Sequence, residues 1–263
     1  MYAFTLEQPK TLADAKRLAG GGAQALAGGQ TLIASLKQRL AQPGALVDLG
    51  GVAELRGIRR EGNSLVIGAM TRHEEVANSA DVKSSIPALA ALAGGIGDRQ
   101  VRAMGTMGGS VANNDPAACY PSAVLALGAT IVTDKREIKA DDFFQGMYST
   151  ALDSGELITA IRFPIPKKAA YAKFRQPASR FALVGVFVAL TDGGARVAIT
   201  GAGNGVFRHA GLEAALGKSF TPEAVQGVAV DAAQLNSDLH ASAEYRAQLI
   251  RVQTQRAVAA ANG

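Results

Sequence analysis

The sequence predicts an α+β fold made of three consecutive segments. Helix-capping patterns alternate with short apolar runs along the first 166 residues, as expected for α/β units. Pro164-Ile165-Pro166 then interrupts the pattern, and further apolar runs followed by one long helical stretch complete the chain. An apolar content of 48% over 263 residues is sufficient for buried cores. We therefore predict three segments, 1–55, 56–166 and 167–263.

The first segment has the pattern of a small α/β lobe. It opens with a capping-box sequence, Thr11-Leu12-Ala13-Asp14, and the glycines Gly20 to Gly22 are expected to end the helix. The remainder predicts a short strand, a glycine loop, a helix and a second strand at Ala25 to Ala27, Gly28 to Thr31, Leu32 to Leu40 and Ala45 to Leu49.

The second segment begins with a predicted strand, Ser64 to Met70, and a second capping-box sequence, Thr71-Arg72-His73-Glu74. A helix from Ile86 to Ala93 is expected to stop at Gly94-Gly95. Beyond it we expect a glycine-rich loop around Gly108-Gly109, then a helix and two strands at Ser122 to Leu127, Thr130 to Thr133 and Leu157 to Phe163.

The third segment predicts three strands and two helices. The strands are expected at Tyr171 to Phe174, Leu183 to Leu190 and Arg196 to Thr200. One helix should start at Thr221-Pro222-Glu223, because proline is favoured at the first helical position. The other, Ala241 to Ala260, places Tyr245, Leu249 and Val252 on one face, a pattern typical of core packing or subunit contact.

Composition excludes several classes of site. The single cysteine, Cys119, excludes an intrachain disulfide framework and a multi-cysteine metal site. The three histidines lack metal-ligand spacing, and we expect His73 to be exposed in the first turn of a helix. The net charge of +5 lacks the basic and aromatic pattern of a nucleic-acid groove. We predict no signal peptide and no integral membrane segment, so the expected location is cytoplasmic.

Two glycine pairs lie beside hydroxyl residues, in Ala27-Gly28-Gly29-Gln30-Thr31 and in Thr106-Met107-Gly108-Gly109-Ser110. Because glycine has no Cβ, the backbone N–H groups of such loops can approach a phosphate closely and form an anion-binding concavity. A helix beginning after Thr31 would favour a phosphate there through its dipole. Two such loops suit a pyrophosphate held from both sides.

The same residues are also compatible with simpler structures. Paired glycines form tight turns or helix caps, and Thr31 could be an N-cap alone. Asn113-Asn114-Asp115-Pro116 offers partners for a ribose or adenine but is also an ordinary turn sequence. Gly201 to Gly205 imitates a dinucleotide fingerprint, yet its third glycine is one position early. The residues alone thus indicate a nucleotide with a pyrophosphate and leave its identity open.

Ala27 to Ile33 and Gly105 to Asn113 resemble the paired FAD loops of the medium subunit in the xanthine dehydrogenase and aerobic carbon monoxide dehydrogenase family. Further similarity covers essentially the whole chain, at Asn114 to Ala118, Gly155 to Ile158, Tyr171 to Phe174, Ala182 to Val186 and His240 to Arg246. The resemblance implies a vanillyl-alcohol-oxidase (PCMH)-type FAD-binding fold, in which two α/β lobes hold the cofactor and a small α+β domain follows.

The resemblance also implies partner chains. A large molybdopterin-binding subunit would oxidise the substrate, and a small subunit would carry two [2Fe-2S] clusters. The three chains would assemble as a dimer of heterotrimers. This chain would pass electrons from the clusters to an external acceptor, with no catalytic residue and no metal of its own. The sequence leaves open the substrate (carbon monoxide, an aldehyde, a purine or another N-heterocycle) and the acceptor (NAD, quinone or oxygen).

The resemblance carries site roles over to individual residues. Thr31 and Thr106 are the expected hydroxyl donors to the pyrophosphate. The complete pyrophosphate set is Ala27, Gly28, Gly29, Gln30, Thr31, Leu32, Thr106, Gly108, Gly109 and Ser110. Ile158 is expected to make a main-chain contact near the flavin or adenine, Lys173 to approach the flavin, and Ile96 to pack against it.

Some of these roles have alternatives. Ile158 could belong to a strand core, and Lys173 could be a solvated lysine with Arg175 in its role. Cys119 stands where some relatives carry an aspartate that contacts the adenosine, a contact that Asp115 or an asparagine could replace. We expect Cys119 to be a buried, inert thiol, because no neighbour in the sequence would activate it.

Two other functions are compatible with the sequence. A self-contained FAD-dependent oxidoreductase of the same fold would need its own acid/base residue and substrate domain, and no such constellation is visible. A non-catalytic nucleotide-binding scaffold would fold normally without retaining FAD.

Overall fold

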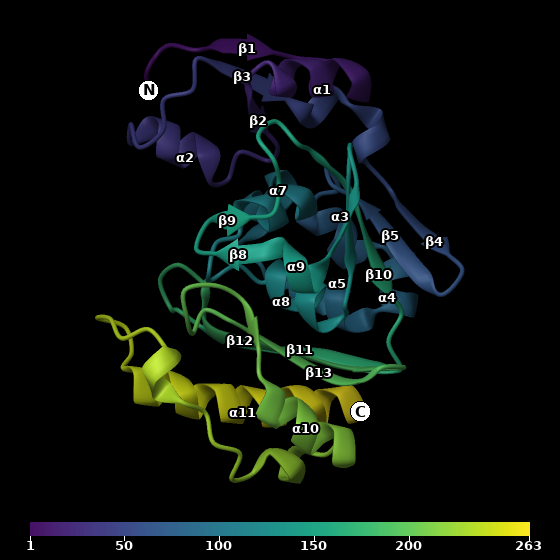
Figure 1. Ribbon diagram of the computed structural model, residues 1–263, viewed down its shortest axis with the longest axis vertical. Helices are drawn as coiled ribbons and strands as arrows, with labels where there is room; N and C mark the ends of the chain where they lie inside the picture. The colour runs from purple at the N-terminus through teal and green to yellow at the C-terminus, as the bar shows by residue number, and fades with distance from the viewer.

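The computed structural model describes residues 1–263 and confirms the predicted α+β class. Its main sheets follow one another along the chain: a parallel sheet of three strands, an antiparallel sheet of five and an antiparallel sheet of four. Figure 1 shows them along the long axis of the molecule, with the N-terminal sheet at the top and the C-terminal helices at the bottom. None of the helices combines the length and the apolar composition needed to cross a membrane.

The first lobe is the parallel sheet, with strand order β1-β3-β2. Its first helix begins as predicted, because the Thr11 side chain accepts a hydrogen bond from the Asp14 N–H at 3.2 Å. Strand β1 was not predicted, since three residues show no clear apolar alternation, and parallel pairing with β3 fixes it instead. The elements are β1 (Thr5–Glu7), α1 (Leu12–Gly20), β2 (Gln24–Leu26), α2 (Leu32–Lys37) and β3 (Ala45–Asp48).

Helix α2 is shorter than predicted. It was expected to reach Leu40 but ends at Lys37. Arg39 adopts a positive φ of 61°, and the Leu40 N–H donates to the Ser35 carbonyl at 2.9 Å, which closes the helix as in a Schellman motif.

The second lobe is the antiparallel sheet, with strand order β4-β5-β10-β6-β7. The three predicted strands are present, and the edge strands β4 and β7 were not predicted. The strands are β4 (Ile58–Glu61), β5 (Ser64–Gly68), β6 (Thr130–Thr133), β7 (Glu137–Lys139) and β10 (Ile158–Pro164), with a small hairpin of β8 (Phe144–Gly146) and β9 (Ser149–Thr150). The helices are α3 (His73–Asn78), α4 (Ala80–Ser85), α5 (Pro87–Gly94), α6 (Arg99–Met104), α7 (Met107–Asn113), α8 (Tyr120–Ala126) and α9 (Ala140–Phe143).

The second capping interaction lies one residue later than predicted. Arg72 precedes helix α3, and Glu75 Oε2 accepts the Arg72 N–H at 2.7 Å. Thr71 instead exchanges hydrogen bonds of 3.2 Å with the backbone of Gly57.

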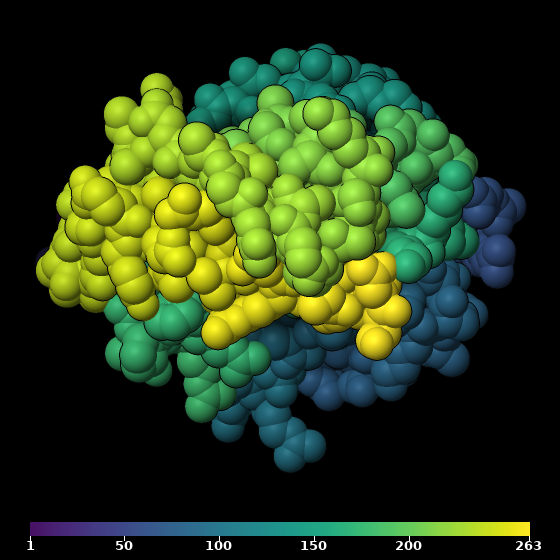
Figure 2. All heavy atoms as spheres, turned by 90° about the horizontal axis from the view of Figure 1, so that it is seen from below, coloured from purple at the N-terminus to yellow at the C-terminus, as the bar shows by residue number.

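The third segment is the four-stranded sheet, with strand order β11-β12-β13-β14. Helices α10 and α11 pack against one face, and α5 and α8 of the second lobe pack against the other. Strand β12 is therefore buried on both faces, which explains its continuous apolar run. Figure 2 shows the C-terminal segments, coloured yellow and light green, covering the outer side. The elements are β11 (Lys168–Arg175), β12 (Ala182–Thr191), β13 (Gly194–Thr200), β14 (Phe207–Arg208), α10 (Ala210–Lys218) and α11 (Ala243–Asn262).

Two predictions for this segment hold only in part. The helix expected at Thr221 starts there, with proline in its first turn, but it is one short 3-10 helix, Pro222–Val225. Of the face predicted for α11, Leu249 lies in the core, whereas Tyr245 is 45% exposed and Arg246, outside that face, is almost fully buried. Its Nη1 donates there to the carbonyls of Leu183 and Gly201, both at 2.8 Å, and its Nη2 donates to the Asp238 carboxylate at 2.7 Å.

The third sheet shares a core with the second lobe. Phe187, Ala189 and Ala198 of the sheet belong to the same buried cluster as the second-lobe side chains. Beside this core, Thr200 Oγ1 lies 2.7 Å from the carbonyl oxygens of both Pro116 and Ala118 and supplies their hydrogen-bond donor. The loop after α7 is thereby tied to strand β13.

We expect Thr200→Val to lower the free energy of unfolding by about 1–3 kcal/mol, because it keeps the side-chain shape but removes the donor to the Ala118 carbonyl. The Pro116 carbonyl keeps a second donor, the Gly201 N–H at 2.7 Å. Urea denaturation of the full chain measures this change. Thr5→Val, on the exposed strand β1, is the matched control and should change stability by less than about 0.5 kcal/mol. Equal effects of the two substitutions would contradict the assigned role of Thr200.

Candidate functional site

A cavity of about 740 Å³ extends between the two lobes and reaches the third segment. This volume lies within the range of small-molecule and cofactor sites. The structure brings every residue predicted for the site to its wall: Ala27, Gly28, Gly29, Gln30, Thr31, Leu32, Ile96, Thr106, Gly108, Gly109, Ser110, Asp115, Cys119, Ile158 and Lys173. The glycines of Gly201 to Gly205, by contrast, lie outside it.

The first glycine loop offers free backbone donors. The N–H groups of Gly28 to Leu32 donate no hydrogen bond within the chain, although all of these residues line the cavity. Gly29 has a positive φ of 71°, a conformation that glycine adopts without strain. Thr31 makes no capping hydrogen bond, so its hydroxyl is also free. This run of donors is suited to binding the oxygens of a phosphate.

The first loop touches the second lobe through backbone atoms. A Cβ added to Gly28 would lie 2.2 Å from the Met104 carbonyl oxygen and 2.7 Å from the Gly105 Cα. A Cβ on Gly109 would lie 3.1 Å from the Ala27 Cβ. Glycine is therefore required at position 28 for the two lobes to approach each other this closely, and a side chain at position 109 would make the contact tight.

The second glycine pair lies in a helix, which corrects the predicted loop. Gly108 and Gly109 belong to α7, and the first N–H groups of this helix are already bonded. Gly108 donates to the Ala69 carbonyl at 2.8 Å, and Gly109 donates to Thr106 Oγ1 at 3.2 Å. A Cβ on Gly108 would lie 2.5 Å from the Ala69 Cβ. This pair therefore allows close packing and does not form a second cradle of free N–H groups.

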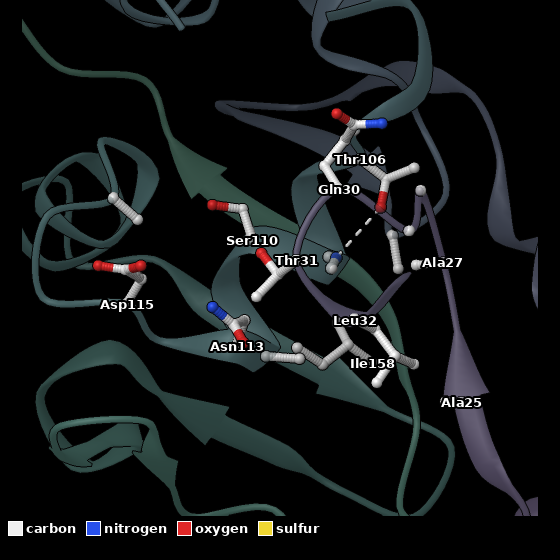
Figure 3. A pocket seen from close by; sticks show the side chains of 18 of the residues that line it. Ala25, Ala27, Gln30, Thr31, Leu32, Thr106, Ser110, Asn113, Asp115 and Ile158 are labelled. Atoms are coloured by element: carbon white, nitrogen blue, oxygen red, sulfur yellow. Dashed lines mark hydrogen bonds between the residues drawn. The ribbon is translucent and has the colours of Figure 1, made fainter. Parts of the chain in front are cut away.

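The second motif contributes hydroxyls to the cavity. Figure 3 shows Thr31 of the first loop and Ser110 of α7 near the centre of the pocket, with Thr106 close by. The Thr106 oxygen accepts from Gly109, so its proton is still available to a ligand, and Ser110 Oγ has no hydrogen-bond partner in the chain. The arrangement is one run of backbone donors faced by side-chain hydroxyls.

A buried carboxylate fixes another part of the cavity wall, residues 153 to 158. Glu156 accepts hydrogen bonds from Thr133 Oγ1 at 2.6 Å, from the Asp153 N–H at 2.8 Å and from the Arg136 guanidinium at 3.0 and 3.1 Å. Burial alone would raise the pKa of Glu156, but the hydrogen bonds from Arg136, Thr133 and Asp153 outweigh it and lower this pKa to about 2. Ile158, at the end of this segment, packs in the core and also lines the cavity.

The surroundings of Cys119 differ from those predicted. The thiol is buried, as expected, but Lys173 Nζ lies 3.5 Å from its sulfur. Lys173 also donates to the carbonyls of Gly95 at 2.8 Å and Arg180 at 3.1 Å, so it is not the freely solvated lysine of the alternative interpretation. Cys119 and Lys173 therefore share one end of the cavity.

His73 is buried, which makes the prediction of an exposed side chain wrong. Only 5% of it is exposed, and its ring packs against Tyr120 at a centroid distance of 5.2 Å. Burial, together with the charge of Arg102, lowers the pKa of His73 to about 4, so the ring is neutral at physiological pH. The His73 ring packs against Gly105: a Cβ added to Gly105 would lie 2.5 Å from His73 Nε2.

Sequence reasoning missed Glu156 and Tyr148. Glu156 lies within Gly155 to Ile158, one of the segments that resemble the family, but no local pattern reveals its pairing with Arg136, 20 residues away in the sequence. Tyr148 lines the cavity from the turn between β8 and β9, a hairpin for which the sequence shows no glycine–asparagine signal.

The fold and the site together are typical of a protein that holds a phosphate-bearing cofactor between two α/β lobes. The family model described as "FAD binding domain in molybdopterin dehydrogenase" matches residues 2–166, which is more than half of the chain. The chain therefore belongs to the family of FAD-binding medium subunits of molybdopterin dehydrogenases.

Individual relatives support this assignment along the whole length. The carbon monoxide dehydrogenase medium chain of Hydrogenophaga pseudoflava is 36% identical, over 98% of this chain and 96% of its own. The glyceraldehyde dehydrogenase medium chain of Sulfolobus acidocaldarius is 34% identical, over 97% and 96%. Among solved structures, reconstituted CO dehydrogenase from Oligotropha carboxidovorans superposes with a TM-score of 0.92 at 35% identity, covering 99% of this chain and 98% of that one. The resemblance found in the sequence is thus confirmed.

We expect Glu156→Gln to destabilise the fold by about 2 kcal/mol at neutral pH, a figure reduced because Arg136 is 46% exposed and solvent screens the pair. The folded-state pKa of about 2 lies below the ordinary 4.5, so this stabilisation is fully present above pH 4.5 and disappears as the pH falls toward 2. Urea denaturation at a series of pH values measures it. A stability difference between the two proteins that stays constant from pH 7 to pH 3 would refute the assignment.

Proposed function

We propose that this chain is the FAD-binding electron-transfer subunit of a molybdenum hydroxylase. Electrons would enter its flavin from [2Fe-2S] clusters on a small subunit and leave to an external acceptor. Substrate oxidation would occur on a large subunit that carries the molybdenum cofactor. The single observation that carries this proposal is the run of free N–H groups at Gly28 to Leu32, set in a cavity of cofactor size in a chain of this family.

The residues present fit FAD. The free N–H groups and the Thr31 hydroxyl would bind one side of the pyrophosphate, and the hydroxyls of Thr106 and Ser110 would bind the other side. The cavity continues in both directions from this point, toward Ala25 on one side and Asp115 on the other, as Figure 3 shows. A dinucleotide has two ring systems joined through a pyrophosphate, and this arrangement accommodates both. FAD, when bound, supplies the redox chemistry.

The cavity favours a relay over a self-contained oxidoreductase. Its buried imidazole, His73, has no carboxylate partner, and Glu156 is fully engaged by Arg136 and its neighbours. Neither is placed as a free general acid or base for a substrate. Medium chains of carbon monoxide and glyceraldehyde dehydrogenases are among the relatives, which supports a role beside a separate large subunit. We propose that the complex is a dimer of heterotrimers located in the cytoplasm. Within this chain, residues 1–55, 56–166 and 167–263 would form the three structural units.

We expect Gly28→Ala to raise the Kd for FAD at least tenfold, because the new Cβ would push the first loop away from Met104 and misplace the N–H groups. Titration of the full chain with FAD, followed by flavin fluorescence, measures Kd. Gly44→Ala is the control, since nothing lies within 4 Å of a Cβ at that position. Unchanged affinity in Gly28→Ala would argue against this loop as the phosphate site.

Removal of the free hydroxyl should also weaken binding. We expect Thr31→Ala to raise the Kd for FAD about tenfold, the effect of losing one hydrogen bond to a charged oxygen. The same loss should be seen with ADP, which retains the diphosphate. An effect on FAD without an effect on ADP would place Thr31 away from the pyrophosphate.

The relay itself is tested under anaerobic conditions with carbon monoxide, an aldehyde and a purine as reductants. We expect one of them to bleach the flavin of the assembled complex, and none to bleach the isolated FAD-loaded chain. Bleaching of the isolated chain by an organic reductant would establish the self-contained oxidoreductase in place of the relay.

A further inference from the structure

Tyr148 occupies an unfavourable backbone conformation at the wall of the cavity. Its φ is 53°, in the left-handed region that bulky residues rarely adopt. The side chain is 58% exposed and lines the cavity from the tip of the β8–β9 hairpin. Strained residues persist only where their surroundings hold them, and they concentrate at functional sites.

The side chain of Asn114 stabilises this turn by hydrogen bonds. It is fully buried, and its side-chain amide donates to the carbonyls of Gly146 at 2.7 Å and Ser149 at 2.8 Å. The Tyr148 N–H donates to the Asn114 carbonyl at 3.2 Å, and the Tyr148 hydroxyl donates to the Asp115 carboxylate at 3.4 Å. The hairpin tip is thereby tied to the end of α7, the helix that carries Ser110.

Tyr148 lies at the end of the cavity whose charge favours the isoalloxazine ring of FAD, the part of the cofactor that is reduced. Through Asp115 it is next to the segment that ends at Cys119, where the Lys173 ammonium lies. A cation favours a ring system that becomes anionic when it is reduced. In Figure 3, Asp115 and Ala25 lie on opposite sides of Thr31 and Ser110, so this end is separated from the one near Ala25 by the phosphate-binding groups.

This end of the cavity is open to solvent. Two exposed aromatic side chains border it, Tyr148 of the second lobe and Phe181 of the third segment. The opposite end, around Ala25, is lined by exposed residues as well, but none of them is aromatic. The Lys173 charge and the exposed aromatic side chains are therefore the features that favour the isoalloxazine ring of FAD beside Tyr148.

We propose that Tyr148 stacks on the isoalloxazine ring of FAD and that its strained turn holds the phenol in position for this contact. The inference rests on the proposed function. Aromatic stacking on a cofactor ring contributes substantially to affinity, and a tyrosine has only two side-chain torsions to immobilise. The hydrogen bond from the phenol to Asp115 fixes the orientation of the ring.

The test compares three variants of the full chain by their Kd for FAD, the fluorescence of the bound flavin and thermal unfolding. Tyr148→Gly should raise Kd about tenfold and increase the fluorescence, because a stacked phenol quenches flavin emission. It should leave stability unchanged or higher, since glycine adopts positive φ freely. Tyr148→Phe keeps the ring, so its Kd should stay within about threefold of the wild type. Met147→Ala, in the same turn but outside the cavity lining, should change neither binding nor fluorescence.

Three outcomes would overturn the inference. A Kd in Tyr148→Gly within twofold of the wild type would show that the ring makes no useful contact. A higher Kd with unchanged flavin fluorescence would place the adenine, not the isoalloxazine, beside Tyr148. A loss of thermal stability without a loss of affinity would give Tyr148 a purely structural role. If the wild-type chain bound no FAD, the proposed function would fail first, so the two failures are distinguishable.

Discussion

The cofactor site depends on one backbone contact, in which Gly28 of the first lobe rests on Met104 and Gly105 of the second. No side chain fits between them, since a Cβ on Gly28 would lie 2.2 Å from the Met104 carbonyl oxygen. This contact fixes the position of the first loop relative to the hydroxyls of the second lobe. The N–H groups of Gly28 to Leu32 find no partner within the chain, so water or an anion must satisfy them. The same loop therefore brings the two lobes together and presents free donors to the cavity.

The two glycine motifs, at Gly28-Gly29 and Gly108-Gly109, are similar in sequence but have different structural roles. In the first, the glycines leave backbone donors free. In the second, Gly108 and Gly109 lie in α7 with their N–H groups already bonded to Ala69 and Thr106, and the missing side chains allow close packing. The binding capacity of the second motif lies in its hydroxyls, Thr106 and Ser110. A glycine pair in a sequence thus indicates that another group comes close to the backbone. Only the structure shows whether that group is a ligand or another part of the chain.

The sequence predicted the central strands of the sheets, most of the longer helices and the first glycine loop, because these depend on local periodicity and on the absence of Cβ. It missed the edge strands β1, β4 and β7, which are short and are fixed by pairing with their neighbours. It did not predict α7, because glycine is a poor helix former and tertiary contacts outweigh that preference here. The burial of His73 was missed because its ring packs on Tyr120, which lies far away in the sequence. The contact of Cys119 with Lys173 joins residues far apart in sequence, and no local pattern encodes it.

Lys173 shows how the third segment contributes to a site built mainly by the two lobes. Its ammonium has three protons, and three acceptors surround it: the carbonyls of Gly95 and Arg180 and the Cys119 sulfur. Its hydrogen-bonding capacity is therefore used within the protein, where it ties α5, the loop after β11 and α8 together. Under the proposed function its influence on the flavin is electrostatic, a fixed positive charge beside a ring that gains negative charge on reduction. Because these bonds hold the charge in place, the protein does not have to reorganise when the electron arrives.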